Sequence, residues 1–303
     1  MITRDASEFF SYAKTLDQAF SPAVAEAVFV VSPIGFSFAE QSARDNRYMA
    51  MQQPINPQQA MMEHQQLQAI LRRHCSVICF PGDLSTPDAV FPNNVFASVP
   101  GKIIIGHMRH PIRQQEAERA DIRRFFTQQM HRTEIDLSLQ SGICELTGSL
   151  IIDRARGIAF CGLSERCDES GARAMHQAFG LRATFLFDLA ATEYHTNVVL
   201  SVLASRAIVI APTGFQDPNV AEAIMAFYSP NVVHLSDAQK GDFAGNCISL
   251  TDKVVAMSLR AKQSLSAAQL AQFERLGFSI EAVPMPMLEM AGGSLRCCVA
   301  ELY

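Results

Sequence analysis

The chain of 303 residues contains no apolar run of the roughly 20 residues that a membrane span requires. Its N-terminus, Met1-Ile2-Thr3-Arg4-Asp5-Ala6, lacks the basic start and apolar stretch of a secretory signal. It also lacks a large net charge: the formal value of −5 gives no reason to expect nucleic acid or an anionic membrane as a partner. We therefore expect a cytoplasmic protein whose ligand is a small molecule.

A metal-binding or disulfide pattern is also missing, although the chain has eight cysteines. Cys75 and Cys79 are separated by three residues inside an apolar run, and Cys161 and Cys167 flank a loop, so neither pair has zinc-site spacing. In a reducing compartment such cysteines remain thiols. The sequence predicts no metal and no cofactor.

The composition is that of a folded globular protein, with 49% apolar and 18% charged residues. A unit of two adjacent strands, a helix and a third strand recurs along it at roughly fifty to sixty residues. The copies are predicted at 91–99, 102–107, 113–130 and 133–139; at 149–153, 158–163, 169–179 and 183–189; at 206–211, 219–228 and 232–235; and at 247–251, 254–258, 266–276 and 279–283.

Further strands are predicted at 24–31 and 76–80, with a helix at 64–74 and a short strand at the end of the chain. Repeated units of this kind favour a closed array around an axis, because a doubly wound sheet would alternate single strands with helices. The repeat therefore favours an α/β fold, a closed radial array of four or five like units that forms one domain over residues 1–303. The polar segment 36–63 is predicted to be an irregular loop that closes over the ligand as a lid.

Four residues that can carry chemistry lie where predicted strands or helices begin: Asp88, Glu145, His195 and Cys297. Each has a structural explanation when taken alone, since aspartate caps turns and free cysteine is commonly a small buried residue. Glu145 is harder to explain in this way, because burying an unpaired carboxylate between apolar residues costs several kcal/mol. Together a thiol, a histidine and a carboxylate are the set that nucleophilic acyl-type chemistry requires.

Five short motifs, in this order, resemble the superfamily of guanidino-group-modifying enzymes, which holds arginine deiminase, dimethylarginine dimethylaminohydrolase and the amidinotransferases. They begin near residue 80 and extend to the C-terminus. The motifs are Pro87-Asp88-Ala89-Val90-Phe91-Pro92-Asn93-Asn94, Glu145-Leu146-Thr147-Gly148-Ser149, Gly162-Leu163-Ser164-Glu165-Arg166, His195-Thr196-Asn197 and Gly292-Gly293-Ser294-Leu295-Arg296-Cys297. The resemblance implies a propeller of five ββαβ units, the pentein fold, in agreement with the repeat.

The resemblance also implies a role for each site residue. Cys297 would be the nucleophile, with Cys298 as the alternative thiol; His195 would be the general acid and base, and Glu145 a carboxylate that grips substrate nitrogens and helps to move protons. Asp88 would bind the substrate. The α-carboxylate of an amino-acid substrate would be held by arginine, whose forked guanidinium suits it, and the candidates are Arg166, Arg109 and Arg113.

The chain departs from guanidinium-binding relatives at Asn94, Ser149 and Asn197, where they place additional carboxylates. A desolvated guanidinium with too few anionic partners is penalised by roughly 3 to 5 kcal/mol, whereas asparagine offers a donor and an acceptor to a neutral ureido group. A citrulline-like substrate is therefore the hypothesis, and the citrulline utilisation hydrolases are the branch most similar to this chain. An amidinotransferase and a non-catalytic propeller that binds a ligand are the alternatives, and a monomer and a homodimer both stay open.

Overall fold

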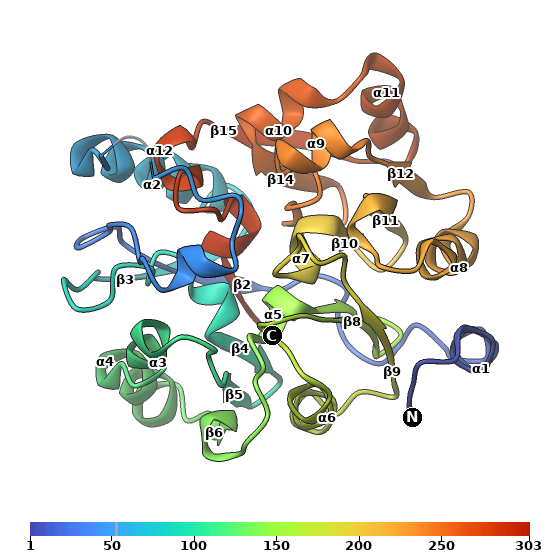
Figure 1. The fold of residues 1–303 in the computed structure, drawn as a ribbon, viewed down its shortest axis with the longest axis horizontal. Helices are drawn as coiled ribbons and strands as arrows, with labels where there is room; N and C mark the ends of the chain where they lie inside the picture. Colours follow the sequence, from blue (N-terminus) through green and yellow to red (C-terminus); the bar gives the residue numbers. More distant parts are fainter. Residues whose placement is uncertain (52–53) are drawn as a thin grey trace.

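In the computed structural model, which describes residues 1–51 and 54–303, five small sheets surround a common axis (Figure 1). Listed along each sheet, the strands are β16 (Ala300–Leu302), β2 (Ala27–Val31) and β3 (Ser76–Phe80); β4 (Phe96–Val99), β5 (Lys102–Ile105) and β6 (Thr133–Asp136); β7 (Leu150–Asp153), β8 (Ile158–Leu163) and β9 (Ala183–Asp188); β10 (Leu200–Leu203), β11 (Ala207–Ile210) and β12 (Val232–His234); and β13 (Ile248–Ser249), β14 (Val254–Ser258) and β15 (Ser279–Val283).

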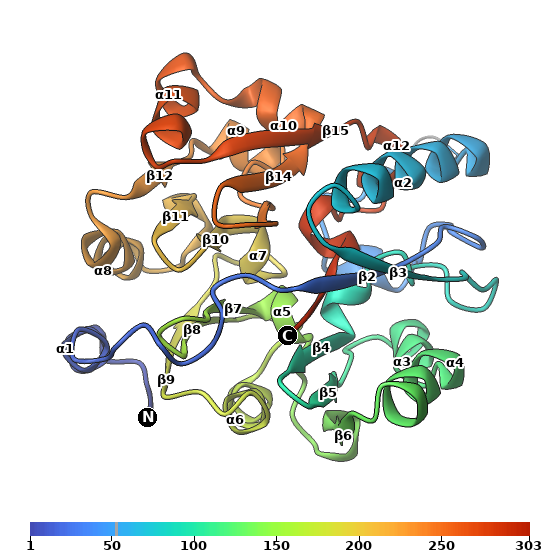
Figure 2. The same ribbon diagram turned by 180° about the vertical axis from the view of Figure 1, so that it is seen from behind.

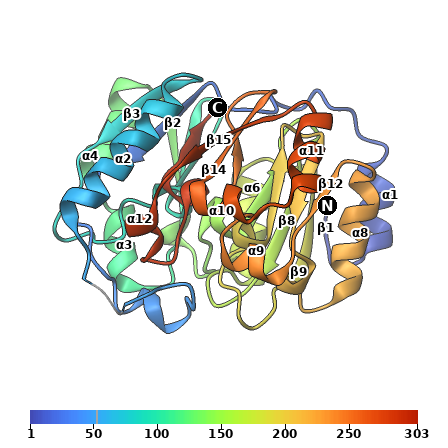
Figure 3. The same ribbon diagram turned by 90° about the horizontal axis from the view of Figure 1, so that it is seen from above.

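The five sheets share one topology. The first strand is antiparallel to the second, and the second is parallel to the third. A parallel neighbour requires a crossover connection, and helices on the outside of the ring provide it (Figure 3). These helices are α2 (Pro57–Leu71), α3 (Pro111–Ala117), α4 (Ala120–Arg124), α6 (Glu169–Ala178), α8 (Pro218–Tyr228), α10 (Leu259–Ser264) and α11 (Ala267–Arg275). Each blade is a ββαβ unit, which confirms the predicted propeller.

The first blade closes the ring with both ends of the chain. Its inner strand β16 comes from the C-terminus and pairs with β2 in the register Ala300–Phe29. The N-terminal segment first adds β1 (Ile2–Thr3) to β9 and packs α1 (Ala6–Ala13) against α8, then crosses behind the ring to β2 (Figure 2). Over the described residues no helix is long and apolar enough to cross a bilayer.

Short helical turns precede the first strand in four of the blades and direct side chains to the axis, where α5 and α7 lie near the centre of Figure 1. They are η2 (Pro92–Asn94), α5 (Leu146–Ser149), α7 (Thr196–Val199) and η6 (Leu295–Cys298). Each strand then continues from its turn toward the opposite end of the axis. The remaining short helices are η1 (Ser42–Arg44), η3 (Phe125–Gln129), η4 (Leu137–Leu139), η5 (Pro212–Gly214), α9 (Asp237–Gly241) and α12 (Pro286–Glu289).

Several predicted boundaries were wrong. The segment 36–63 is not irregular to its end, because α2 begins at Pro57 instead of residue 64. Proline is favoured at the first position of a helix, and the side chain of Asn56 caps this one by accepting from the N–H groups of Gln58 and Gln59. The helix predicted at 113–130 is divided into α3, α4 and the π-helical turn η3.

Two strand predictions also change. Only Phe96–Val99 of the predicted strand 91–99 is extended, because Pro92–Asn94 forms the turn η2. In the fourth blade the sequence analysis identified one strand, at 206–211, and missed its hairpin partner β10. The turn between the two strands places Ala204 and Ser205 at positive φ without a glycine, so the usual turn residues are absent there.

Candidate active site

The thiol of Cys297 lies on η6, at the end of the axis where the helical turns converge. Two side-chain amides donate to its Sγ: Nδ2 of Asn246 at 3.4 Å and Nδ2 of Asn197 at 3.6 Å. N–H donors of this kind stabilise the negative charge of a thiolate. Gly292 lies five residues before Cys297 and has a φ of +77, a conformation that favours glycine. The Gly292 carbonyl accepts a hydrogen bond from the hydroxyl of Tyr194 at 2.6 Å.

Cys298 is also buried, but it is not on the wall of the cavity that Cys297 lines. Burial first, and then the neighbouring Cys297, raises the pKa of the Cys298 thiol well above its ordinary value. A thiol with a raised pKa is protonated at neutral pH and is a poor nucleophile. The geometry therefore favours Cys297 over Cys298.

Glu145 and His195 form a fully buried pair just before α5 and α7, with 2.8 Å between Glu145 Oε2 and His195 Nε2. Burial works to raise the pKa of Glu145, but the Arg166 guanidinium and the hydrogen bond from His195 outweigh it and hold that pKa well below its usual range. Burial lowers the pKa of His195, and Glu145 opposes this only in part, so the imidazole is neutral at pH 7.

The tautomer of His195 follows from this pair. An ionised carboxylate only accepts hydrogen bonds, so the proton of the neutral ring is on Nε2 and Nδ1 is an acceptor. Nδ1 is buried and has no hydrogen-bond partner among the described residues. His195 thus has one ring nitrogen oriented by Glu145 and the other free to take a proton.

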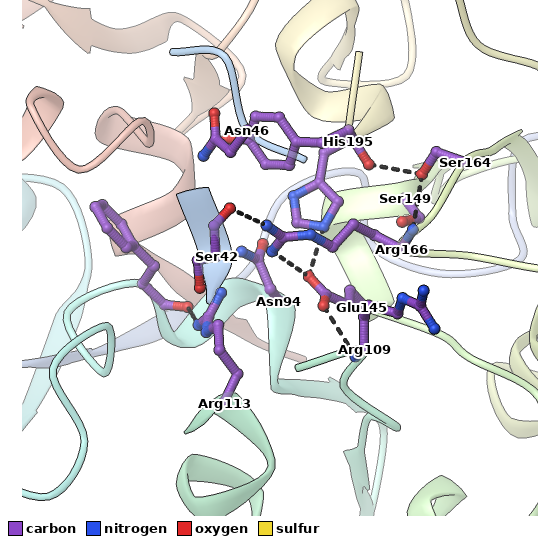
Figure 4. Close-up of polar contacts among 12 residues, drawn as sticks. Ser42, Asn46, Asn94, Arg109, Arg113, Glu145, Ser149, Ser164, Arg166 and His195 are labelled. Carbon is purple, nitrogen blue, oxygen red and sulfur yellow. Dashed lines mark hydrogen bonds and ion pairs between the residues drawn. The ribbon is translucent and has the colours of Figure 1, made fainter. Parts of the chain in front are cut away.

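Arg166 is the centre of the polar network in Figure 4 and is almost fully buried. It donates to Oε2 of Glu145 at 3.3 Å, to the carbonyl of Ser42 at 3.0 Å and to both carboxylate oxygens of Asp45, the shortest contact being 2.5 Å. Burial favours a higher pKa for Asp45, but Arg166 and then His110 outweigh it and lower that pKa. Arg166 was predicted to hold a substrate carboxylate; here it holds a carboxylate of the chain.

The two other predicted arginines differ in their placement. The guanidinium of Arg109 lies at the surface, where it pairs with Glu165 at 3.1 Å, and only its backbone N–H reaches Glu145 Oε1, at 3.2 Å. Arg113 is buried, lines the cavity beside Cys297, and donates through Nε and Nη2 to Glu116 and to the carbonyl of Phe91. Its Nη1 makes no hydrogen bond within residues 1–51 and 54–303. The structure brings Arg113, but not the Arg109 side chain, to the cavity.

A small cavity lies between Arg113, Arg166 and Cys297. About 10 Å³ of it is available to the centres of water molecules, which is room for one water molecule. Asp88 and Asn94 line it, together with Cys297 and Arg113. Asp88 accepts from the hydroxyl of Ser42 at 2.8 Å, whereas its Oδ1 is buried without a partner among the described residues. Burial raises the pKa of Asp88, and Arg113 only partly opposes this. His195 and Glu145 are not part of its wall; Glu145 contacts the lining residue Arg166, and His195 contacts Glu145.

Sequence reasoning missed the part of the site that comes from residues 42–48. Ser42 and Asn46 form part of the cavity wall, and Asp45 pairs with Arg166. The segment is held at its far end by buried Glu193, which accepts from Tyr48 at 2.6 Å and from Arg47 at 2.7 Å. No repeat extends over this stretch, so nothing in the sequence indicated which of its polar residues face inward.

Asn246 was also missed, although the repeat contains a signal for it. It lies two residues before β13, just as Asn94 lies two residues before β4. Asn246 donates to Cys297 Sγ and to the carbonyl of Asn197, and its Oδ1 accepts the N–H of Arg296 at 3.0 Å. Superimposing the repeats in sequence would have placed Asn246 at the pocket.

Gly148 leaves the space that His195 and Asn94 occupy. A Cβ at this position would lie 2.8 Å from His195 Cε1 and 2.8 Å from Asn94 Oδ1. We expect Gly148→Ala to displace the imidazole and to lower kcat/KM by about 10²-fold, the usual cost of a misplacement near 1 Å. Gly241→Ala is the matched control, because a Cβ there meets no atom within 4 Å. Equal activity of the two variants would contradict the placement of His195.

Metal-binding geometry is not found in the described part of the chain, which has no group of three or more His, Cys, Asp or Glu side chains able to hold an ion.

Comparisons with known proteins agree with this fold. The model of the family described as N,N dimethylarginine dimethylhydrolase, eukaryotic, matches residues 32–303. The chain is 24% identical over 251 residues to the uncharacterised protein YkgA of Bacillus subtilis (strain 168). The aligned region covers 82% of each sequence.

Two solved structures are similar in fold. The product-bound N-terminal domain of ArgZ, an arginine dihydrolase from the ornithine-ammonia cycle in cyanobacteria, has a TM-score of 0.79 at 17% identity, covering 91% of this chain and 97% of that one. A dimethylarginine dimethylaminohydrolase variant with an S-methyl-L-thiocitrulline adduct has a TM-score of 0.70 at 17% identity, covering 92% of this chain and 100% of that one. Because the family model matches nearly the whole chain, the protein belongs to the N,N-dimethylarginine dimethylhydrolase family, in the superfamily of guanidino-modifying enzymes with the pentein fold.

Proposed function

We propose that this hydrolase of carbon–nitrogen bonds uses the Cys297 thiolate to cleave a ureido or guanidino amino acid, with release of ammonia. The observation that supports it is the position of Cys297 on the cavity wall, where the amides of Asn197 and Asn246 donate to its Sγ. Arg166 on the same wall contacts Glu145 of the buried Glu145–His195 pair. A neutral imidazole held by an ionised carboxylate is the group that takes a proton from a thiol or from water.

In the proposed reaction, the proton of the Cys297 thiol passes to His195 Nδ1, and the thiolate adds to the central carbon of the ureido or guanidino group. His195 then returns the proton to the leaving nitrogen, whose bond to that carbon breaks, and a thiocarbamate-type or thiouronium-type intermediate remains on the sulfur. Water, deprotonated by the same ring, adds to the carbon and releases the thiol. Glu145 keeps the ring in one tautomer throughout and stabilises the imidazolium when it forms.

A citrulline-like substrate fits the polar groups of the cavity best. Asn94 lines the cavity with a neutral amide, Asn197 and Asn246 place neutral amides against the Cys297 sulfur, and Asp88 adds one buried carboxylate oxygen that lacks a partner among the described residues. A ureido group needs no compensating negative charge, whereas a guanidinium would need more anions than Asp88 alone provides, because Glu145 already pairs with Arg166. The free Nη1 of Arg113 is the donor proposed for the substrate carboxylate.

The substrate panel that tests this proposal contains citrulline, arginine, agmatine and methylated arginines, with ammonia and released alkylamines as the readout. Ammonia from citrulline alone supports the ureido hydrolase. Ammonia from an arginine derivative would mean that Asp88 and Glu145 hold a cation by themselves. Transfer of an amidino group to glycine without ammonia would overturn the hydrolase in favour of an amidinotransferase.

We also propose that part of the segment 36–63 opens and closes the cavity. The proposal leaves out residues 57–63, which belong to α2, and residues 52–53, which lie outside the described residues. The closed cavity admits about one water, and Ser42 and Asn46 form part of its wall, so a substrate enters only when they move. Residues from Ser42 to Cys297 line the same pocket, which supports treating residues 1–303 as one domain.

Limited proteolysis checks this movement. Arg44 and Arg47 are exposed, and we expect trypsin to cut after them more slowly when citrulline is bound to an inactive Cys297→Ala protein. Glu193→Gln is the matched comparison: it weakens the contacts of Arg47 and Tyr48 with the buried carboxylate, so cleavage should be faster. Identical cleavage with and without substrate would argue against a lid.

A further inference from the structure

A second cavity lies on the propeller axis, at the end opposite Cys297. The first strands of four blades form its walls: Leu150, Ile151 and Ile152 of β7, Ser201 and Val202 of β10, Ile248 and Ser249 of β13, and Glu301 of β16. These strands start at the turns that form the active site and continue away from it. Arg154 follows the end of β7, and Tyr303 follows the end of β16, so both lie at the far mouth. About 40 Å³ is available there to water centres, room for about three molecules.

The cavity contains a buried guanidinium without an anionic partner. Arg154 is 8% exposed, stacks at 4.0 Å on the ring of Tyr303, and donates one hydrogen bond, to the carbonyl of Ser98 at 3.3 Å. No carboxylate within residues 1–51 and 54–303 forms an ion pair with it. A buried cation in this situation is stabilised by an anion that accepts from its remaining N–H groups.

Ser249 supplies a second, independent sign that a ligand is missing from the cavity wall. Its side chain is 8% exposed and its Oγ is buried without a hydrogen-bond partner among the described residues. The neighbouring hydroxyl of Ser201, by contrast, has its single proton shared between the carbonyls of Gly245 and Cys247, at 2.7 and 2.9 Å. A buried hydroxyl in a polar cavity is satisfied when an acceptor occupies the space beside it.

The charge of the cavity also favours an anion. Arg296, which lines the inner end, is neutralised by Glu301, with 2.9 Å between Nη2 and Oε2. Among the side chains that line the cavity, Arg154 is thus the cation that has no carboxylate partner within the described residues, and the space is large enough for a group of three or four oxygen atoms.

We propose that this far end of the axis binds a small oxyanion, a phosphate or carboxylate group, through the Arg154 guanidinium and the Ser249 hydroxyl. The site is separate from the reacting thiol, but the two are joined through one residue. The side chain of Arg296 faces this cavity, and its backbone N–H holds Asn246, which donates to Cys297 Sγ.

The proposal is tested by titrating the full chain with inorganic phosphate in a chloride buffer and measuring the binding by calorimetry. We expect saturable binding that weakens about tenfold or more in Arg154→Gln, the effect of losing a charge-assisted hydrogen bond. Arg173→Gln, an exposed arginine outside the cavity, should bind as the wild type does. The same titration with acetate distinguishes a phosphate site from a carboxylate site, and saturable binding of either anion that depends on Arg154 supports the proposal.

Ser249→Ala keeps the test decisive if Arg154→Gln does not fold, since it removes one hydroxyl and leaves the strand intact. It should weaken binding about threefold to tenfold, as expected for one neutral hydrogen bond. Binding unchanged in Ser249→Ala and Arg154→Gln would place the anion elsewhere, for example at Arg113, and would overturn the proposal. If the wild type binds neither phosphate nor acetate when the anion is in about 100-fold excess over the protein, the proposal is overturned as well. Neither result depends on turnover, so failure here is distinct from failure of the proposed reaction.

Discussion

Cys297→Ala is expected to abolish ammonia release, with a loss of about 10⁴-fold or more, since no other group can form the covalent intermediate. The fold should survive, because the sulfur is replaced by a smaller apolar group and only two weak donors, from Asn197 and Asn246, lose their acceptor. Steady-state kinetics and circular dichroism on the same sample separate the two effects.

Cys298→Ala is the matched control for that experiment. Cys298 is the next residue, is equally buried, and does not line the cavity. We expect it to lose some stability and to keep nearly all of its activity. The opposite outcome, an inactive Cys298→Ala beside an active Cys297→Ala, would exchange the roles of the two thiols.

Glu145→Gln is expected to have the next largest effect, a loss of about 10²- to 10⁴-fold in kcat. The amide can donate to His195 Nε2, which would put the ring proton on Nδ1 and remove the base. The change also leaves the buried Arg166 with one carboxylate fewer, although Asp45 still pairs with it. Glu165→Gln is a suitable control, because that exposed carboxylate pairs with the surface guanidinium of Arg109.

The pKa of His195 gives a readout of Glu145→Gln that does not depend on turnover. A carboxylate favours the imidazolium, and so raises the pKa of its histidine; removing Glu145 must lower the pKa of His195 below its already depressed value. In an NMR titration the ring should stay neutral to a lower pH than in the wild type, with His195→Asn used to assign the signal. A pKa that rises would show that Glu145 is not ionised in the folded protein.

The repeat explains why the architecture could be predicted from the sequence. Each blade buries its strands on both sides, so β5, β8 and β11 appear in the sequence as apolar runs. The hairpin turns that precede β5 and β8 also contain recognisable glycine or proline. The errors lie where a local signal was ambiguous. Pro57 begins a helix inside the segment 36–63 that was predicted to be irregular, and the hairpin at Ala204-Ser205 has no turn glycine.

The candidate site was predictable only where a motif marked it. Glu145, His195, Asn197 and Cys297 lie on turns that occupy equivalent positions in different blades, so the repeat brings them to one end of the axis. The partners of Arg166 were not predictable in this way, because Asp45 is 121 residues distant and lies in a segment outside the repeat. Whether a buried arginine faces a substrate or another part of its own chain depends on such long-range contacts, which local sequence does not record.

The closure of the ring by β16 links catalysis to the integrity of the whole molecule. The strand that seals the first blade follows directly after the reactive thiol, so any fluctuation that detaches β16 from β2 also withdraws the sulfur from its two amide donors. Local opening elsewhere on the ring has no such direct effect. On the role proposed for Cys297, closure of the ring is therefore a requirement for activity, and a chain in which β16 has not paired with β2 should be inactive.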